Sequence, residues 1–188
     1  MSGRRVTVLG ISGSLRQGSF NTAALRAAQE LAPDGMTIER GDISTLPLYD
    51  EDVRAAGFPA AVQRLRDQIA VADALLFVTP EYNYSVPGVL KNAIDWASRP
   101  PDQPFNGKPA AIMGASPGMI GTARAQYHLR QSCVFLNMHV VNKPEVMIGG
   151  AAGKFDAEGR LTDETTRGFI RDLLVALAAW TERLRPAT

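Results

Sequence analysis

The most informative stretch of the sequence is residues 6–21, VTVLGISGSLRQGSFN. It begins with the apolar, β-branched run from Val6 to Ile11, which is typical of a strand buried on both faces of a sheet. Glycines and serines follow, and from Asn21 to Leu31 small and apolar residues recur at helical spacing. The stretch therefore predicts a strand, a flexible polar loop and a helix in direct succession, the repeating unit of a parallel α/β sheet.

The same alternation continues along the chain. Further strands are predicted at 36–40, 74–79, 110–114 and 139–141, and helices at 59–71, 87–97, 122–135 and 162–184. Five strands that alternate with helices imply a parallel sheet covered on both faces. We expect one domain over residues 1–188, because no linker, repeat or low-complexity tract interrupts the pattern and this length suffices for one core.

Composition narrows the class of protein. The chain is 45% hydrophobic and 21% charged, as in ordinary globular proteins. Its 20 basic and 19 acidic residues nearly cancel, so the charge indicates neither a nucleic-acid nor a membrane partner. No stretch approaches the roughly 18 apolar residues of a spanning helix, and the run at 6–9 is too short for the apolar part of a signal peptide. With Cys133 as the single cysteine, a cytoplasmic protein is expected.

Ligand sites of such sheets lie beyond the carboxyl ends of the strands. This rule selects three loops, at 12–20, 80–87 and 115–121, which are also the most unusual stretches of the sequence. We therefore expect the functional site where these three loops meet.

The loop at 12–20 predicts an anion site. Unpaired N–H groups at the start of the following helix carry partial positive charge. Ser14, Ser19 and Asn21 can donate hydrogen bonds to phosphate oxygens, and Arg16 can add a bidentate ion pair. Two other phosphate loops are excluded, because Ser19 stands where a Walker loop needs lysine and the glycines at 10, 13 and 18 do not match a dinucleotide fingerprint. A monophosphate fits better, the alternative being a small-residue turn with a solvated arginine.

The loop at 80–87 is suited to a flat ring with polar edges. Two prolines stiffen it, and aromatic and amide side chains lie between them. Tyr82 can lie along such a ring and Asn83 can hydrogen-bond its edge. The alternative is a turn that packs Tyr82 and Tyr84 against the sheet.

The loop at 115–121 offers similar chemistry. Gly118 and Gly121 permit close approach of the backbone to a ligand. With the hydroxyl of Ser116, their amides can line the other edge of the ring. Alone this is weak evidence, but three such loops at strand ends are much stronger together.

With these residues in place, the chain resembles the NADPH-dependent FMN reductases, a family of flavodoxin-like quinone, azo-dye and chromate reductases. The resemblance is carried by residues 13–21, 80–88 and 91–96, and the element order agrees to about residue 184. It implies a flavodoxin-like three-layer sandwich, with a five-stranded parallel sheet of order 2-1-3-4-5. It also implies FMN as the bound cofactor and NAD(P)H as the co-substrate.

The resemblance implies ligands for each end of the cofactor. The phosphate set is Ser14, Arg16, Ser19, Phe20 and Asn21, and the isoalloxazine set is Pro80, Glu81, Tyr82, Asn83, Ser116 and Gly118. The flavin carries the chemistry, so we expect ping-pong transfer of two electrons from NAD(P)H to a quinone, azo compound, flavin or metal oxyanion. No metal and no protein nucleophile is expected. Glu81 and Tyr82 are the nearest candidates for a general acid, although nothing in the sequence requires one.

The family further implies a homodimer or homotetramer, with the segment 91–96 near an interface. Trp96 is then either exposed for that contact or an ordinary core residue. One rival is a flavodoxin-type electron carrier without NAD(P)H activity, but flavodoxins are strongly acidic and this chain has a net charge of +1. The other rival is a ligand-binding module without flavin.

Cys133 lies in a predicted helix and is expected to be an inert, half-buried thiol. His128 and His139 lack the spacing of metal ligands with any cysteine or carboxylate cluster.

Overall fold

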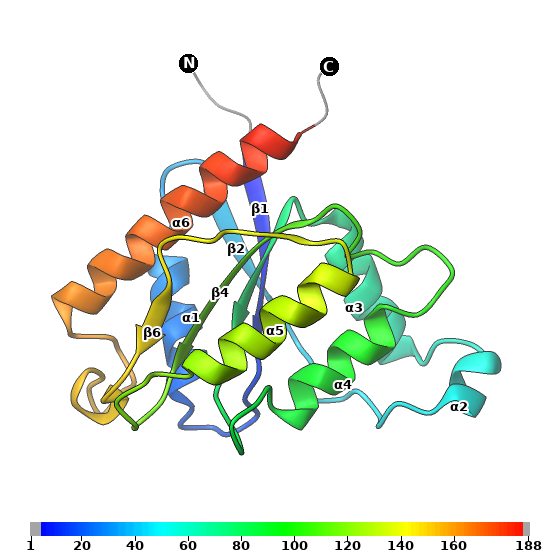
Figure 1. Cartoon of the computed structure of the whole chain (residues 1–188), viewed down its shortest axis with the longest axis horizontal. Coiled ribbons are helices and arrows are strands. Elements are labelled where there is room, and N and C mark those ends of the chain that lie inside the picture. Colours follow the sequence, from blue (N-terminus) through cyan, green and yellow to red (C-terminus); the bar gives the residue numbers. More distant parts are fainter. Residues whose placement is uncertain (1–4, 186–188) are drawn as a thin grey trace.

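The protein is built on a parallel sheet, seen in a computed structural model that describes residues 5–185 (Figure 1). The strands are β1 (Val6–Ser12), β2 (Met36–Gly41), β3 (Ala74–Val78), β4 (Pro109–Ala115), β5 (His139–Val140) and β6 (Val146–Ile148). All strand pairings in these residues are parallel, and the order is β2-β1-β3-β4-β5. The predicted flavodoxin-like order is therefore confirmed.

The sheet has one strand more than the sequence predicts. β5 pairs with the start of β4 and β6 with its end, so two short strands share the position beside β4. β6 has only three residues, which is too short for a periodic pattern to reveal it.

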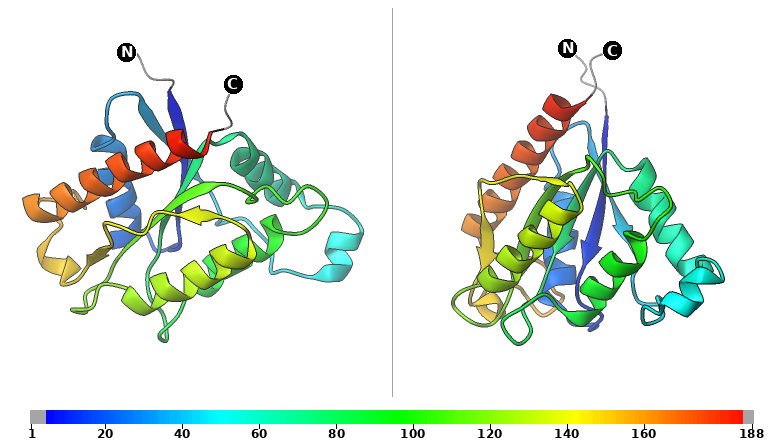
Figure 2. Two further views of the ribbon diagram at one scale, coloured as in Figure 1. Left: turned by 45° about the horizontal axis from the view of Figure 1, so that its top comes forward. Right: turned by 45° about the vertical axis from the view of Figure 1, so that its right-hand side comes forward.

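Helices cover both faces of the sheet (Figures 1 and 2). On one face pack α1 (Phe20–Glu30) and α6 (Glu164–Leu184), and on the other α3 (Ala60–Val71), α4 (Gly88–Ala97) and α5 (Ala123–Phe135). The ends of these helices lie within two residues of the predictions. A short α2 (Glu51–Ala55) and a 3-10 turn, η1 (Ala151–Gly153), complete the described elements and were not predicted.

Burial on both faces explains the apolar strands. Every residue of β3 and of β4 is buried. Because side chains alternate along a strand, Leu76 and Val78 join the core under α1 and α6, while Leu75 and Phe77 join the core under α3, α4 and α5.

Trp96 belongs to the core. Its side chain is fully buried at 0% exposure, and its Nε1–H donates to the carbonyl oxygen of Pro47 at 2.9 Å. The ring of Tyr49 meets it edge-on, with centroids 4.9 Å apart. The alternative of an exposed Trp96 at a subunit contact is therefore wrong.

A buried arginine fixes the end of α4. Arg66 of α3 is 6% exposed, and the ring of Phe58 lies 4.2 Å from its guanidinium carbon. It donates to four backbone carbonyl oxygens, those of Ala97, Arg99, Pro101 and Asp102. The last turn of α4 and the loop after it are thereby held against α3.

The loops after β1, β3 and β4 all emerge at the lower edge of the molecule in Figure 1. The expectation of one domain over 1–188 stays a prediction, and residues 1–4 and 186–188 lie outside the described residues. Within residues 5–185, no helix is both long enough and apolar enough to cross a membrane.

Candidate functional site

The first two loops touch at Gly13. Its N–H donates to the carbonyl oxygen of Val78 at 2.9 Å, which continues the pairing of β1 with β3. A Cβ at this position would lie 3.1 Å from the ring of Pro80 and 3.2 Å from that of Pro87. Glycine at 13 therefore lets the proline-framed loop approach the loop 12–20.

The first and third loops are joined by Asn21. Its side-chain amide donates to the carbonyl oxygen of Ala115 at 2.9 Å and accepts from the N–H of the same residue at 2.8 Å. Asn21 is 4% exposed, so these two bonds fix the start of α1 to the end of β4. The side chain is thus already engaged, and its predicted contact with phosphate stays a prediction.

The loop before α1 presents free hydrogen-bond donors. The backbone N–H groups of residues 14–18 donate to no other residue in the described part of the chain. Ser14 is 6% exposed, and its hydroxyl has no hydrogen-bond partner within residues 5–185. Ser19 caps α1, with its Oγ accepting from the N–H of Thr22 at 3.2 Å, and its own hydroxyl proton remains free to donate. Unpaired donors at the positive end of a helix fit an anion such as the phosphate of FMN.

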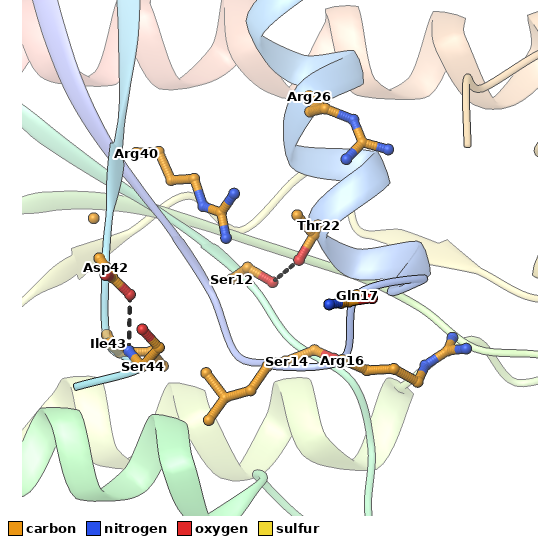
Figure 3. A pocket seen from close by; sticks show the side chains of 12 residues that line it. Ser12, Ser14, Arg16, Gln17, Thr22, Arg26, Arg40, Asp42, Ile43 and Ser44 are labelled. Carbon is orange, nitrogen blue, oxygen red and sulfur yellow. Dashed lines mark hydrogen bonds between the residues drawn. The ribbon is translucent and has the colours of Figure 1, made fainter. Parts of the chain in front are cut away.

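Arg16 supplies the cation of this loop. Its guanidinium carbon lies 5.6 Å from the ring centroid of Phe20 and extends away from the neighbouring cavity in Figure 3. It forms no ion pair with any residue between 5 and 185. Phe20, at the start of α1, packs on Phe155 with centroids 5.5 Å apart. The structure therefore gathers the predicted phosphate set around the start of one helix.

Glu81 caps a helix from outside it. Its Oε2 accepts from the backbone N–H groups of Arg124 at 3.0 Å and Ala125 at 3.2 Å, in the first turn of α5. Thr122, at the capping position of α5, makes no side-chain cap hydrogen bond. The carboxylate also pairs with the Arg124 guanidinium, and its side chain is only 9% exposed. These contacts engage both carboxylate oxygens of Glu81 with the first turn of α5, and its role as a general acid stays a prediction.

A tight turn displays the aromatic residues of the second loop. The backbones of Tyr82 and Ser85 exchange hydrogen bonds of 3.2 and 3.0 Å. Asn83 and Tyr84 between them have φ values of 49° and 67°, the left-handed region that side chains disfavour. The Arg124 guanidinium carbon stacks 3.5 Å from the Tyr84 ring centroid and holds the turn in place. Tyr82 remains 51% exposed, so it is available to a ligand.

The third loop packs against the end of β6. The Ser116 Oγ accepts from the N–H of Gly118 at 3.1 Å, and the Ser116 N–H donates to the carbonyl oxygen of Ile148 at 3.0 Å. A Cβ on Gly149 would come within 2.2 Å of the carbonyl oxygen of Met119. The third loop thus rests on β6 and Gly149, which the sequence did not predict; the Gly149-Gly150 pair after an apolar run was the available signal.

His128 contacts the second loop through Ser85, whereas His139 and Cys133 lie in β5 and α5. The Nδ1 of His128 lies 2.9 Å from the hydroxyl of Ser85, while the backbone oxygen of His139 accepts from Trp180 at 2.9 Å. Cys133 is 1% exposed, more buried than expected, and burial raises the pKa of its thiol to about 12.

The chain is similar to known oxidoreductases along nearly its whole length. A family model described as NADPH-dependent FMN reductase matches residues 6–153. An NAD(P)H-dependent FMN reductase of Pseudomonas aeruginosa is 67% identical over 180 residues, which cover 96% of this chain and 97% of that protein. A quinone reductase of Escherichia coli K12 is 48% identical over 184 residues, covering 96% of this chain and 98% of the relative.

A solved structure agrees with these relatives. It is FerB of Paracoccus denitrificans, described as a flavoenzyme NAD(P)H:(acceptor) oxidoreductase, with a TM-score of 0.87 and 41% sequence identity. The match covers 95% of this chain and 98% of that one.

Proposed function

Since this chain belongs to the NADPH-dependent FMN reductase family and is thus an NAD(P)H-dependent FMN enzyme, we propose that it transfers two electrons to a small oxidised acceptor by a ping-pong mechanism. When bound, the flavin supplies the hydride-accepting and electron-donating chemistry. The protein binds the cofactor, orients it and shields one side of it from water.

The observation that carries the proposal is the set of free donors before α1. The N–H groups of residues 14–18 and the hydroxyl of Ser14 have no partner in residues 5–185. Asn21 fixes these donors to the end of β4, next to the loop that we assign to the ring. One flavin mononucleotide has an anionic end and a flat polar end, which match the two ends of this arrangement.

We assign residues to the cofactor as the family resemblance implies. Ser14, Arg16, Ser19 and Phe20 hold the phosphate end, with Asn21 contributing its backbone and its position. The ring end is formed by Pro80, Glu81, Tyr82, Asn83, Ser116 and Gly118, with Glu81 acting through Arg124 and α5. No side chain is assigned as a catalytic acid.

An apolar rim favours a flat aromatic acceptor. Tyr82, Met119 and Ile120 lie on the second and third loops and are 51%, 88% and 51% exposed. Such side chains bind a quinone better than a hydrated oxyanion, because burial of apolar surface is the available driving force. Quinones are therefore the first acceptor in the proposal, followed by azo compounds, flavins and metal oxyanions.

We also propose that the protein acts as a homodimer or homotetramer in the cytoplasm. Tyr127, Val134 and Phe135 on the outer side of α5 are 48%, 79% and 85% exposed, an apolar surface that a second copy can cover. Sedimentation velocity over a range of concentrations measures the assembly.

Anaerobic stopped-flow spectroscopy tests the function. NADPH or NADH mixed with FMN-loaded protein is expected to bleach the flavin, and a quinone added afterwards to restore its colour. Initial rates at varied donor and acceptor are expected to give parallel double-reciprocal lines, with free FMN at equal concentration as the control. Flavin that stays oxidised would refute the enzyme proposal, and intersecting lines would refute the ping-pong order.

A further inference from the structure

A cavity lies beside the loop 12–20, on the side that faces the end of β2. Its volume is about 620 Å³, and it opens between α1 and the end of β2 (Figure 3). The residues that line it are Ser12, Ser14, Leu15, Arg16, Gln17, Thr22, Arg26, Arg40, Gly41, Asp42, Ile43 and Ser44.

This cavity is separate from the place assigned to the flavin ring. Of the described residues that line it, none belongs to the loops 80–87 or 115–121. In the sheet, β2 and β3 lie on opposite sides of β1. A group in this cavity therefore stands on the β2 side of the loop 12–20, whereas the ring loops lie on the β3 side.

Arg40 is the principal cation of the cavity. It stands near the end of β2, and Figure 3 shows its guanidinium reaching into the space between β2 and α1. Its backbone belongs to the pairing of β2 with β1, whereas its guanidinium makes no hydrogen bond or ion pair with the rest of residues 5–185. Arg26 lines the same space from α1, with one guanidinium N–H donating to the carbonyl oxygen of Gly159 at 3.2 Å.

Asp42, the one acidic residue among the described lining, already accepts a hydrogen bond from within the protein. Asp42 accepts a hydrogen bond from the N–H of Ser44 at 2.8 Å. That bond, with Arg40 and Arg64 nearby, holds the pKa of the Asp42 carboxyl below its ordinary value. Arg16, Arg26, Arg40 and Asp42 are the charged residues among the described lining. Because the Arg16 side chain extends away from the cavity in Figure 3, two arginines and one aspartate remain, and positive charge is still in excess.

Hydroxyl groups form the floor. The Oγ of Ser12 and the Oγ1 of Thr22 lie 3.0 Å apart, and both residues are buried. One proton of this pair is free for a ligand, because two hydroxyls share one hydrogen bond. Ser14 belongs to the loop 12–20 and also lines the cavity. It is 6% exposed, and its hydroxyl has no hydrogen-bond partner inside the described range.

We propose that this cavity binds a phosphate monoester in addition to the flavin phosphate, with Arg40 as its main ligand and Arg26, Ser12 and Thr22 around it. A guanidinium pairs with phosphate through two parallel hydrogen bonds, and hydroxyl donors complete the shell. The volume exceeds that of phosphate alone and lies in the range of small-ligand sites. The monoester is either the 2′-phosphate of NADPH or the phosphate of a separate metabolite.

The test is a calorimetric titration of FMN-saturated protein with inorganic phosphate. In the proposed function, FMN occupies the anion site before α1, so phosphate that binds to FMN-saturated protein reports on a different site. One phosphate per chain is expected to bind, and Arg40→Ser is expected to weaken binding at least tenfold. The matched control is Arg171→Ser, which removes an arginine from α6 that is 48% exposed and does not line the cavity. Retained FMN binding and an unchanged melting temperature show that Arg40→Ser is folded, and Arg40→Gln provides a second variant.

Three results would overturn the proposal. They are no saturable phosphate binding in the presence of FMN, equal affinity in Arg40→Ser and wild type, and equal weakening in Arg171→Ser. Competition then identifies the source of the monoester. Displacement of phosphate by NADPH but not by NADH assigns the site to the 2′-phosphate, and displacement by neither assigns it to another phosphorylated compound.

Discussion

At the scale of single residues, Arg16 is the side chain that most directly tests the cofactor site. It is exposed, it lies beside the free N–H groups of residues 14–18, and it has no ion-pair partner among the described residues. We expect Arg16→Ala to weaken FMN binding roughly tenfold to a hundredfold, about 1.5–3 kcal/mol, because one charge-assisted contact is lost.

Quenching of flavin fluorescence on titration measures this affinity. Arg171→Ala serves as the control, since it removes an exposed arginine from α6. An unchanged dissociation constant for Arg16→Ala would show that the guanidinium stays in solvent when FMN is bound.

Cys133 is expected to be unreactive in the folded protein. Burial raises the pKa of its thiol from the ordinary 9.0 to about 12, so the nucleophilic thiolate is scarce at neutral pH. The unfolded chain loses this proton above about pH 9 and the folded chain does not. The stabilising contribution of the thiol is thus complete below pH 9 and is lost as the pH rises toward 12.

Reaction with Ellman's reagent, a disulfide, measures the reactivity of the Cys133 thiol. At pH 8 the native protein is expected to release almost none of the coloured thiolate from the reagent, and the protein unfolded in guanidinium is expected to release one equivalent per chain. Fast reaction of the native protein would contradict the burial of Cys133.

The sequence predicted which residues stand in the loops but not which of them are already engaged. Asn21 bonds to Ala115, which is 94 residues away, and Glu81 bonds to Arg124, 43 residues away. Local patterns contain no information about such pairings, because they depend on how the loops come together in three dimensions. The sequence therefore predicts which side chains of the loops can form hydrogen bonds, but it does not predict which partner each of them has in the fold.

At the scale of elements, the cap of α5 links a helix to the loop that we assign to the ring. Glu81→Gln removes the charge from the carboxylate that accepts from the first turn of α5 and pairs with Arg124. We expect a loss of roughly 1–2 kcal/mol in the free energy of unfolding, because a largely buried charge-assisted contact is weakened. FMN affinity is expected to fall about threefold to tenfold as well, since Tyr84 is held by the same arginine.

Urea unfolding and an FMN titration on the same samples measure both effects. Glu158→Gln is the matched control, because the Glu158 side chain is 66% exposed in its pair with Arg160 and such pairs contribute about 0–1 kcal/mol. If Glu81→Gln resembles this control in both measurements, the cap does not position the loop.

The junction of α3 with α4 depends on Arg66. Arg66→Met is expected to destabilise the protein by roughly 2–4 kcal/mol, because carbonyl groups at the end of α4 lose their donor. Thermal and urea unfolding measure the change, and FMN affinity is expected to stay within about twofold since the junction lies far from the loops. Wild-type stability of Arg66→Met would mean that water replaces the guanidinium.

Long or strongly patterned elements were predictable. β3 and β4 are buried over their whole length, so their sequences are continuous apolar runs that predict buried strands. α2 has five residues, none of them buried, and therefore has no apolar stripe. β6 is held in place by its pairing with β4. Such elements depend on tertiary contacts, and their own composition does not reveal them.

At the scale of the whole molecule, FMN is expected to stabilise the fold because its proposed site uses three loops far apart in the chain. At a free concentration about 100 times its dissociation constant, it adds about 2.7 kcal/mol to the free energy of unfolding. For a chain of this size this corresponds to a rise in Tm of roughly 5–10 °C.

Differential scanning calorimetry with and without FMN measures the shift. At the same total FMN concentration, the Tm of Arg16→Ala is expected to rise less than that of the wild type, because this variant binds less of the FMN. No shift at saturating FMN would show that the folded state gains nothing from the cofactor.

The pair of hydrogen bonds between Asn21 and Ala115 has a consequence for the apoprotein. They make the start of α1 and the end of β4 one rigid unit, so the separation of the two ends of the site is set during folding. Little conformational entropy is then lost when a flavin arrives. We therefore expect these loops to change little when a flavin binds, and selection among flavins to depend on whether their length matches a spacing that already exists.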